Sequence, residues 1–285
     1  MSYPKISIVT PSFNQAPYLE ETLLSVIGQN YPNLEYIVID GGSTDGSVDI
    51  IRKYEKHLAY WISEKDKGMY DAIQKGFARS TGEIMGWINS DDRYFPKSFF
   101  VLADIFAGHP EVQWLQANPS LINEEGQIVG NYSSRKWSRY HFYMYDYKYI
   151  QQESTFWRRN LWVKAGSSLR TDLKLAGDFE LWLRFFDHAD LYTLHSVLGA
   201  FRIRSSNQFS LDKLEEYNAE CETEISKKVE SLNPDCLKNL RYLKMYWSFY
   251  SRIPFLKGRM KNKFNRILAS PTVVYDRKSQ SFITK

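Results

Sequence analysis

Carboxylates, glycines and hydroxyls follow two apolar, strand-like runs of this 285-residue chain. Asp40 and Asp45 flank Gly41–Thr44 after the run that begins at Tyr36, and Asn89–Asp92 follows the run that begins at Ile84. A buried parallel strand has this appearance where its carboxyl end opens on a ligand crevice. Two such strand ends close together in the chain predict one shared site.

The segment around Asp40 and Asp45 is compatible with a nucleotide ligand. Glycines let a ligand approach the backbone closely, and a carboxylate at a strand end can accept hydrogen bonds from ribose hydroxyls or base N–H groups. An Asp-Gly turn that joins a strand to a helix, with Asp45 as the helix cap, would have the same sequence. The segment alone leaves both interpretations open.

Asp91 and Asp92 are adjacent carboxylates, which repel each other unless a cation or water screens them. Mg²⁺ or Mn²⁺ is commonly held by one or two protein carboxylates together with substrate phosphate oxygens. The alternative is a solvated pair that caps a helix starting near Pro96. The five histidines are scattered along the chain, so no His or Cys cluster offers a competing metal site.

Strand-like and helix-like segments alternate through the first hundred residues, which predicts an α/β fold with a parallel sheet and right-handed crossover helices. Strands are expected at Ile6–Thr10, Leu34–Ile39, Tyr60–Ser63 and Ile84–Ile88, with helices between them and after Pro96. Further on we expect short irregular strands over Val112–Ile150, a helix over Gly177–Asp187, two strands over Leu191–Arg204, and helices over Leu211–Leu232 and Pro234–Tyr250.

Six short motifs, in this order, resemble those of family 2 glycosyltransferases with the GT-A fold. They are Ile8–Asn14, Gln29–Glu35, Ile39–Gly46, Ser63–Ala72, Gly82–Ile84 and Asn89–Asp92. The match is dense over residues 5–100 and sparser to 210. The resemblance implies a glycosyltransferase domain over 1–210, with a nucleotide-sugar half (1–100) and an acceptor half (101–210). Residues 211–285 would be a helical, basic extension.

The resemblance also implies a role for individual residues of the nucleotide site. Thr10, Pro11 and Asp40 would line the nucleobase and ribose pocket, with Asp66 beside them. Asp45, in the same motif as Asp40, belongs to this predicted nucleotide-binding set.

For the metal site, the resemblance implies that Asp92 is the metal-binding member of the family's Asp-X-Asp element. Asp91 would lie nearby on the nucleotide side, and the cofactor would be Mn²⁺ or Mg²⁺. The chain departs from the family at Ser90, where the first carboxylate of the element is expected.

Asp178 is the candidate catalytic base. Inverting members of the family use a carboxylate at the start of a helix beneath the acceptor, and Gly177–Arg184 corresponds to that place. The family usually has Glu where this chain has Gly177. A first helical turn favours the ionised carboxylate, which is the form that a base needs. The alternative is that Asp178 caps an ordinary amphipathic helix.

Two further pairs are candidates for substrate contacts. Gln152 and Glu153 lie in a segment that resembles the family's acceptor side. Arg202 and Arg204 could approach the diphosphate, because guanidinium groups pair well with phosphate oxygens.

Charge is balanced overall but uneven along the chain. The 37 basic and 33 acidic residues give a net charge of +4, which does not indicate nucleic acid binding. Residues 238–266 carry basic residues interleaved with aromatics and contain no acidic residue. This pattern suits an anionic membrane surface, although a core-packing helix followed by a solvated basic tail would also produce it.

Other features favour a cytoplasmic protein, attached peripherally to the membrane if the basic and aromatic faces segregate. The amino terminus has no signal-peptide pattern, and no run of about eighteen apolar residues occurs. Cys221 and Cys236 lack metal-ligand spacing, which favours free thiols in a reducing compartment.

These observations predict an inverting glycosyltransferase. It would move a sugar from a nucleoside diphosphate donor, of which UDP-sugars are the favoured class, to a glycan or lipid-linked glycan of the cell surface. A sugar nucleotidyltransferase is the first alternative, but Pro11–Pro17 lacks the Gly-rich basic loop that such enzymes usually carry. A binding module that has lost activity is the second, because Ser90 and Gly177 depart from the family pattern.

Overall fold

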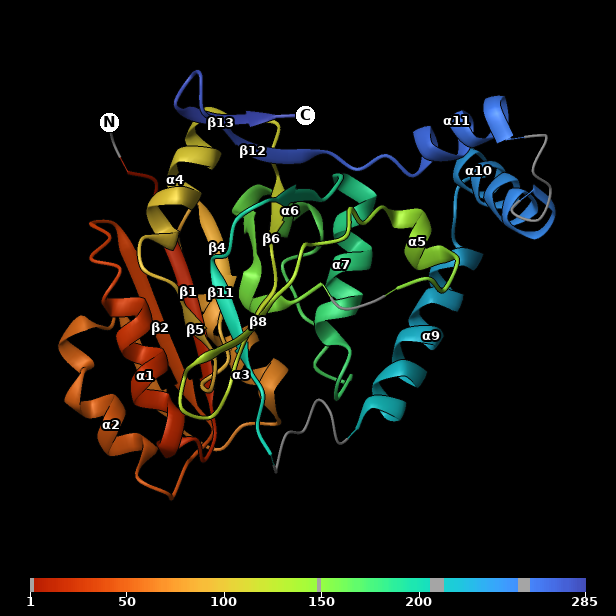
Figure 1. Cartoon of the computed structure of the whole chain (residues 1–285). Helices are drawn as coiled ribbons and strands as arrows, with labels where there is room; N and C mark the ends of the chain where they lie inside the picture. The colour runs from red at the N-terminus through yellow and green to blue at the C-terminus, as the bar shows by residue number, and fades with distance from the viewer. Residues whose placement is uncertain (1–2, 148–149, 206–212, 251–256) are drawn as a thin grey trace.

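The computed structural model describes residues 3–147, 150–205, 213–250 and 257–285. Its central sheet has nine strands in the order β13-β12-β10-β6-β9-β4-β1-β2-β3 (Figure 1). These strands are β1 (Ile6–Ser12), β2 (Leu34–Asp40), β3 (Tyr60–Ser63), β4 (Ile84–Trp87), β6 (Trp114–Ala117), β9 (Thr155–Arg158), β10 (Tyr192–Leu194), β12 (Thr272–Asp276) and β13 (Ser281–Thr284). A second sheet has the order β5 (Arg93–Tyr94), β11 (Gly199–Arg202), β7 (Ser120–Ile122) and β8 (Ile128–Asn131).

The amino-terminal half of the central sheet is parallel, as expected. β1 pairs in parallel with both β2 and β4, so the polar segments that follow β2 and β4 emerge at the same edge of the sheet. The other half is mixed, because β9 pairs antiparallel with both β4 and β6. The short strands expected within Val112–Ile150 exist, but the helix α5 (Arg139–Tyr143) also lies there.

Helices cover both faces of the central sheet, and the expected ones are present (Figure 1). The expected helices are α1 (Ala16–Ile27), α2 (Ser47–Lys53), α3 (Met69–Arg79), α4 (Ser98–Gly108), α7 (Gly177–His188), α9 (Leu214–Glu230) and α10 (Pro234–Met245). Two more, α6 (Arg159–Lys164) and α11 (Lys257–Ile267), were not expected individually. Pro17 lies in the first turn of α1, where its missing N–H has no intrahelical partner to lose.

Successive side chains of β1 point to opposite faces of the central sheet, and a separate hydrophobic cluster lies on each face. Val9 belongs to a cluster with residues of α3 and α7, and Ile8 belongs to a cluster with residues of α1 and α4. At Gly76 of α3, an added Cβ would lie 2.4 Å from the Val9 side chain. The helix therefore packs on the strand at a distance that a larger residue would not allow.

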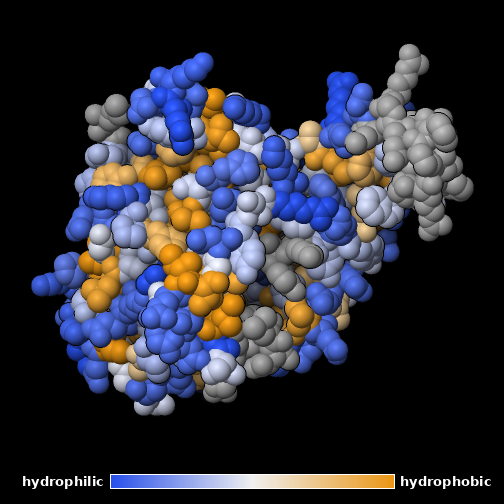
Figure 2. Space-filling model, viewed as in Figure 1, coloured by the Kyte–Doolittle hydropathy of each residue, from blue (hydrophilic) through white to orange (hydrophobic). Residues whose placement is uncertain are grey.

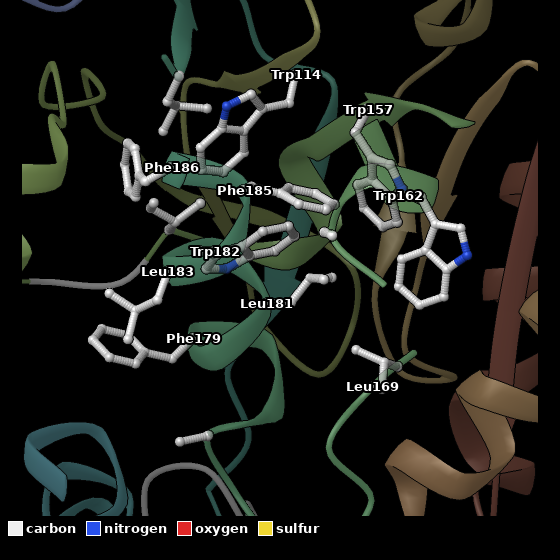
Figure 3. Close-up of a cluster of buried hydrophobic side chains, with 14 of the residues drawn as sticks. Trp114, Trp157, Trp162, Leu169, Phe179, Leu181, Trp182, Leu183, Phe185 and Phe186 are labelled. Atoms are coloured by element: carbon white, nitrogen blue, oxygen red, sulfur yellow. The ribbon is translucent and has the colours of Figure 1, made fainter. Parts of the chain in front are cut away.

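An aromatic cluster fixes α7 against the sheet. The Trp182 ring stacks on Trp87 and on Trp114, each with ring centroids 5.7 Å apart. Figure 3 shows Trp182 among Trp114, Trp157 and Phe185. All five are almost fully buried, and aromatic side chains of this size contribute much of a core's stability. Because Trp182 lies one helical turn after Asp178, the same packing fixes the start of α7.

The carboxyl-terminal extension is helical, as expected, but it ends in a hairpin. β12 joins the central sheet in parallel with β10, and β13 folds back on β12. In Figure 1, α10 and α11 project away from the body of the protein while the hairpin returns to it. Cys221 and Cys236 are both free thiols, as expected. Among the described residues, no helix has the length and apolar character needed to cross a membrane.

Candidate active site

The loop after β2 is organised by Asp40. Its carboxylate is fully buried and accepts hydrogen bonds from the backbone N–H of Ser43 at 2.8 Å and from the Ser43 and Ser63 hydroxyls at 2.5 and 2.7 Å. Both carboxylate oxygens are therefore engaged by the protein. A nucleoside could reach Asp40 only by displacing one of these hydroxyls, so its predicted nucleotide contact stays a prediction.

Asp45 has the capping role that the sequence left open. Its carboxylate accepts from the backbone N–H of Ala16 at 2.9 Å and from the N–H and hydroxyl of Ser47 at 3.0 and 2.6 Å. Ala16 and Ser47 are the first residues of α1 and α2. Asp45 thus accepts hydrogen bonds from the first residues of both helices, which favours the capping interpretation over a nucleotide contact.

The structure places the Thr10 side chain in the core and not at the loop surface. The Thr10 hydroxyl shares a 3.0 Å hydrogen bond with the Tyr36 hydroxyl, and Thr10 is fully buried. Pro11 is also buried. Phe13, two residues after Pro11, is 59% exposed and is the aromatic ring that this segment presents to solvent.

Asp66 lies beside the Asp40 loop, as predicted. A Cβ added at Gly41 would lie 2.6 Å from the Asp66 carboxylate, so the two loops are in direct contact. Asp66 also accepts a 2.8 Å hydrogen bond from the backbone N–H of Gly68, in the turn before α3. The carboxylate is partly exposed, which leaves it accessible to a ligand.

Asp91 and Asp92 differ in accessibility. Asp92 is fully buried, and its carboxylate accepts hydrogen bonds from the Arg202 backbone N–H at 2.9 Å and from Gln152 Nε2 at 3.3 Å. The Asp91 side chain is 17% exposed and forms an ion pair with Arg204 at 3.1 Å. The prediction that Asp92 is the metal ligand therefore fits its surroundings poorly, and Asp91 is the acid that a metal could reach.

The two arginines of this segment have different environments. Arg202 is fully buried, where its guanidinium donates to the carbonyl oxygens of Asp91 and Asn123 at 2.6 and 2.8 Å and to the Glu21 carboxylate at 2.5 Å. In this arrangement a ligand cannot reach the Arg202 guanidinium, so a diphosphate contact from Arg202 would need the site to rearrange and stays a prediction. Arg204 is partly exposed beside Asp91 and keeps its candidate role.

Asp178 lies in the first turn of α7, as predicted. The Tyr70 hydroxyl lies 3.1 Å from Asp178 Oδ1 and also donates to the Leu175 carbonyl at 2.6 Å. Burial raises the pKa of Asp178 to about 6, although hydrogen bonds from the Phe179 N–H and from Tyr70 oppose the shift. A carboxyl with this pKa is ionised at neutral pH and can still accept a proton, which suits a general base.

The Tyr70 ring also explains the departure at Gly177. A Cβ added at Gly177 would lie 2.9 Å from three atoms of the ring. Tyr70 thus occupies the space that a side chain at position 177 would need. Tyr70 lies within the motif Ser63–Ala72, but nothing in the sequence indicates that its ring contacts the backbone of Gly177.

Gln152 and Glu153 are buried and do not face solvent as acceptor contacts would. Glu153 is 1% exposed and accepts a 3.2 Å hydrogen bond from the Ser154 hydroxyl. Burial raises the pKa of Glu153 to about 8, and the negative charge of Asp178 adds to the shift. In the same way, burial and the charges of Asp91 and Glu153 raise the pKa of Asp92 well above its usual range.

The charges of these acids influence one another: those of Asp91 and Glu153 contribute to the raised pKa of Asp92, and that of Asp178 contributes to the raised pKa of Glu153. The described residues contain no cluster of three or more His, Cys, Asp or Glu side chains that could hold a metal. A metal here would need substrate oxygens among its ligands, as is usual for Mg²⁺ and Mn²⁺.

A large α/β sheet flanked by helices, with acids following its parallel strands, is the architecture of the GT-A fold. The profile of the family described as "Glycosyl transferase family 2" matches residues 7–167, which is more than half of the chain. The chain belongs to this family, so the resemblance seen in the sequence is confirmed.

The curated relatives are named as glycosyltransferases. A Mycobacterium tuberculosis glycosyltransferase is 43% identical over 94 residues, covering 33% of this chain and 36% of the relative. The putative teichuronic acid biosynthesis glycosyltransferase TuaG of Bacillus subtilis is 38% identical over 96 residues, covering 32% and 37%. A Rickettsia typhi glycosyltransferase is 25% identical over 235 residues, covering 76% and 70%. The chain thus aligns with little more than a third of the mycobacterial and Bacillus relatives.

Solved structures confirm the fold. S. aureus TarS 1–349 in complex with UDP-GlcNAc superposes with a TM-score of 0.66 at 17% identity, covering 93% of this chain and 82% of TarS 1–349. The mannosyltransferase PcManGT from Pyrobaculum calidifontis, in complex with GDP-Man and Mn²⁺, gives a TM-score of 0.54 at 16% identity, covering 94% and 86%.

Proposed function

We propose that this protein is an inverting glycosyltransferase of cell-surface polysaccharide biosynthesis. It transfers a hexosyl or N-acetylhexosaminyl group from a nucleoside diphosphate sugar to a hydroxyl of a glycan or lipid-linked glycan. The observation that carries the proposal is the Asp178 carboxylate in the first turn of α7, contacted by the Tyr70 hydroxyl at 3.1 Å, in a chain that the family 2 profile matches. The UDP-GlcNAc bound to TarS favours a UDP-sugar as donor, and the name of TuaG favours a role in cell-surface polysaccharide biosynthesis.

In this mechanism Asp178 accepts the proton of the acceptor hydroxyl as the acceptor oxygen attacks the anomeric carbon. The attack comes from the face opposite the nucleoside diphosphate, which leaves with the bonding electron pair, so one displacement inverts the anomeric centre. Tyr70 orients the Asp178 carboxylate through its 3.1 Å contact. Arg204, beside Asp91, can pair with oxygens of the departing diphosphate.

The residues around Asp91 fit a divalent cation. Asn89 Oδ1 is buried without a hydrogen-bond partner in the described part of the chain, and the Asp91 carboxylate two residues on is partly exposed. An amide oxygen and a carboxylate oxygen are ligands that suit Mg²⁺ and Mn²⁺. When bound, such a cation acts as a Lewis acid that neutralises charge on the leaving diphosphate.

A thermal-shift panel tests the donor class. UDP, GDP and dTDP are added at one common concentration, so that the nucleotide with the lowest dissociation constant stabilises the fold most; one present at 100 times its dissociation constant adds about 2.7 kcal/mol if it binds the native state alone. We expect UDP with Mn²⁺ to raise Tm most, and UDP with EDTA to raise it less. A panel in which no nucleoside diphosphate changes Tm, with or without Mn²⁺, would contradict the proposed function.

We propose further that residues 1–210 form the catalytic domain and that the extension, 211–285, attaches the protein to the inner face of the plasma membrane. Lys238, Arg241 and Lys244 of α10 are exposed, and Trp247, directly after α10, is 64% exposed. Figure 2 shows hydrophilic and hydrophobic surface side by side where α10 and α11 project. Arg252 lies in 251–256, outside the described residues.

Vesicle sedimentation tests this attachment. Each cation near an anionic surface contributes about 1 kcal/mol, so the combined variant Lys238→Ala, Arg241→Ala, Lys244→Ala should bind phosphatidylglycerol vesicles on the order of 100-fold more weakly. The control carries the same charge change at exposed Lys56, Arg277 and Lys278. Equal binding by the two triple variants, or equal binding to neutral phosphatidylcholine vesicles, would contradict attachment through α10.

A further inference from the structure

The loop that leads to Asp178 joins α6 to α7 and is held by side chains of other elements. Arg184 of α7 donates to the Ser168 carbonyl at 2.7 Å. Gln74 of α3 accepts from the Leu169 N–H at 2.8 Å. Both contacts fix the first half of the loop, so the position of Asp178 depends on what holds the second half.

Glu220 of α9 holds the last three residues before α7. Its Oε1 accepts from the Lys174 N–H at 3.1 Å, and its Oε2 accepts from the Leu175 and Ala176 N–H groups at 3.0 and 2.9 Å. Ala176 is the N-cap residue of α7, and alanine has no side-chain oxygen to satisfy the N–H groups at a helix start. A carboxylate from a distant helix therefore binds the N-cap residue of α7 and the two residues before it, which no side chain of α7 itself caps.

The opposite side of the same segment is held by Tyr70. The Leu175 carbonyl accepts from the Tyr70 hydroxyl at 2.6 Å, and that hydroxyl also contacts Asp178. Leu175 is thus fixed through its N–H by Glu220 and through its C=O by Tyr70. Loss of the Glu220 contacts would free the segment that aligns Tyr70 with Asp178.

We propose that Glu220 is a positioning residue for the transfer reaction, through which the carboxyl-terminal extension sets the geometry of the catalytic base. The inference rests on the proposed role of Asp178. Glu220 lies beyond residues 7–167, the part that the family profile matches. The extension would therefore be needed for turnover as well as for attachment.

The electrostatics around Asp178 give this role a second observable. The titratable groups that face Asp178 are Tyr70 from α3, Tyr217, Glu220 and Cys221 from α9, and Glu153 before β9. The negative charge of Glu220 adds to burial in raising the pKa of Asp178. A neutral residue at position 220 should therefore lower the pKa of Asp178. When turnover is plotted against pH, its fall on the acidic side (the acidic limb) should then occur at a lower pH than in the wild type.

Glu220→Ala and Glu220→Gln test the inference, with Glu222→Ala and Glu222→Gln as controls at an exposed residue of the same helix. In Glu220→Ala, amide hydrogen exchange at residues 174–176 should rise about tenfold or more, because three hydrogen bonds are lost. Turnover should fall by about 10- to 100-fold, while UDP binding and the donor KM change less than about twofold. Transfer is assayed with UDP-GlcNAc, UDP-Glc, UDP-Gal and GDP-Man as donors.

Glu220→Gln keeps the side-chain size and one acceptor oxygen, so it carries the test if the alanine variant does not fold. Its turnover should lie between those of wild type and Glu220→Ala, with the acidic limb at lower pH. Suppose that Asp178→Asn is inactive but the Glu220 variants match the Glu222 controls in turnover and in amide exchange. That result would overturn the role of Glu220 and leave the base assignment of Asp178 standing. A fully active Asp178→Asn would overturn both the base assignment and the inference.

Discussion

Asp178→Asn should lower the turnover number by about 10³-fold, within the range that general-base catalysis usually contributes. Asparagine has nearly the same size as aspartate, so the start of α7 and the Tyr70 contact should persist. The amide cannot accept the proton of the acceptor hydroxyl. Initial transfer rates should therefore collapse while the thermal shift produced by UDP remains, which separates lost chemistry from lost binding.

The wild-type rate should depend on pH in a defined direction. Since burial raises the pKa of Asp178 to about 6, the rate should fall as pH drops through about 6 and level off above it. Asp190→Asn, which neutralises an exposed acid just after α7, is the control and should keep the wild-type rate and profile. An Asp178→Asn protein with full turnover would show that another group takes the proton.

The location of the site was predictable from the sequence, because its signal is local. A run of apolar residues that ends in carboxylates marks the end of a buried strand wherever it occurs, and parallel pairing of β1 with β2 and β4 then brings Asp40 and Asp91 to one edge. The position of Asp178 at a helix start was predictable for the same reason.

The roles of neighbouring acids were not predictable, because they depend on contacts between segments far apart in the chain. Asp91 and Asp92 are adjacent in the sequence, and Asp92 is held in its buried position by the Arg202 N–H and the Gln152 side chain, which lie 110 and 60 residues away. Asp45 likewise is a cap because Ala16 and Ser47 both reach it. Glu220 carries no motif that would distinguish it from other acids of α9.

The return of β12 and β13 to the central sheet was also missed. These strands follow the long basic helical stretch, and β12 pairs with β10, a strand about 80 residues earlier. Their own sequences, Thr-Val-Val-Tyr-Asp and Ser-Phe-Ile-Thr, do favour strands, but nothing local indicates that β12 pairs with β10. The consequence is that residues 211–285 contact the rest of the chain through both α9 and β12.

Asp91→Ala and Asp92→Ala should differ in their response to Mn²⁺. Asp91→Ala removes a largely buried ion pair, in which the Asp91 and Arg204 side chains are 17% and 12% exposed, so this variant should also have a lower Tm than the wild type. If Asp91 holds the cation, this variant should lose the Mn²⁺-dependent part of the UDP thermal shift. Its turnover should fall on the order of 100-fold or more. Mutating a residue that only hydrogen-bonds a metal ligand typically costs about 10- to 100-fold in activity, and removing the metal ligand itself should cost more.

Asp92→Ala should differ from Asp91→Ala in that it keeps the Mn²⁺-dependent part of the UDP thermal shift. It leaves the Arg202 N–H and the Gln152 amide buried without their acceptor, at a cost of about 1–3 kcal/mol each, so Tm should fall by several degrees. The added effect of Mn²⁺ on the UDP shift should remain, because Asp91 and Asn89 are unchanged. The reverse result, with Mn²⁺ dependence lost in Asp92→Ala at unchanged Tm and kept in Asp91→Ala, would mean that the site rearranges on donor binding and that Asp92 is the ligand after all.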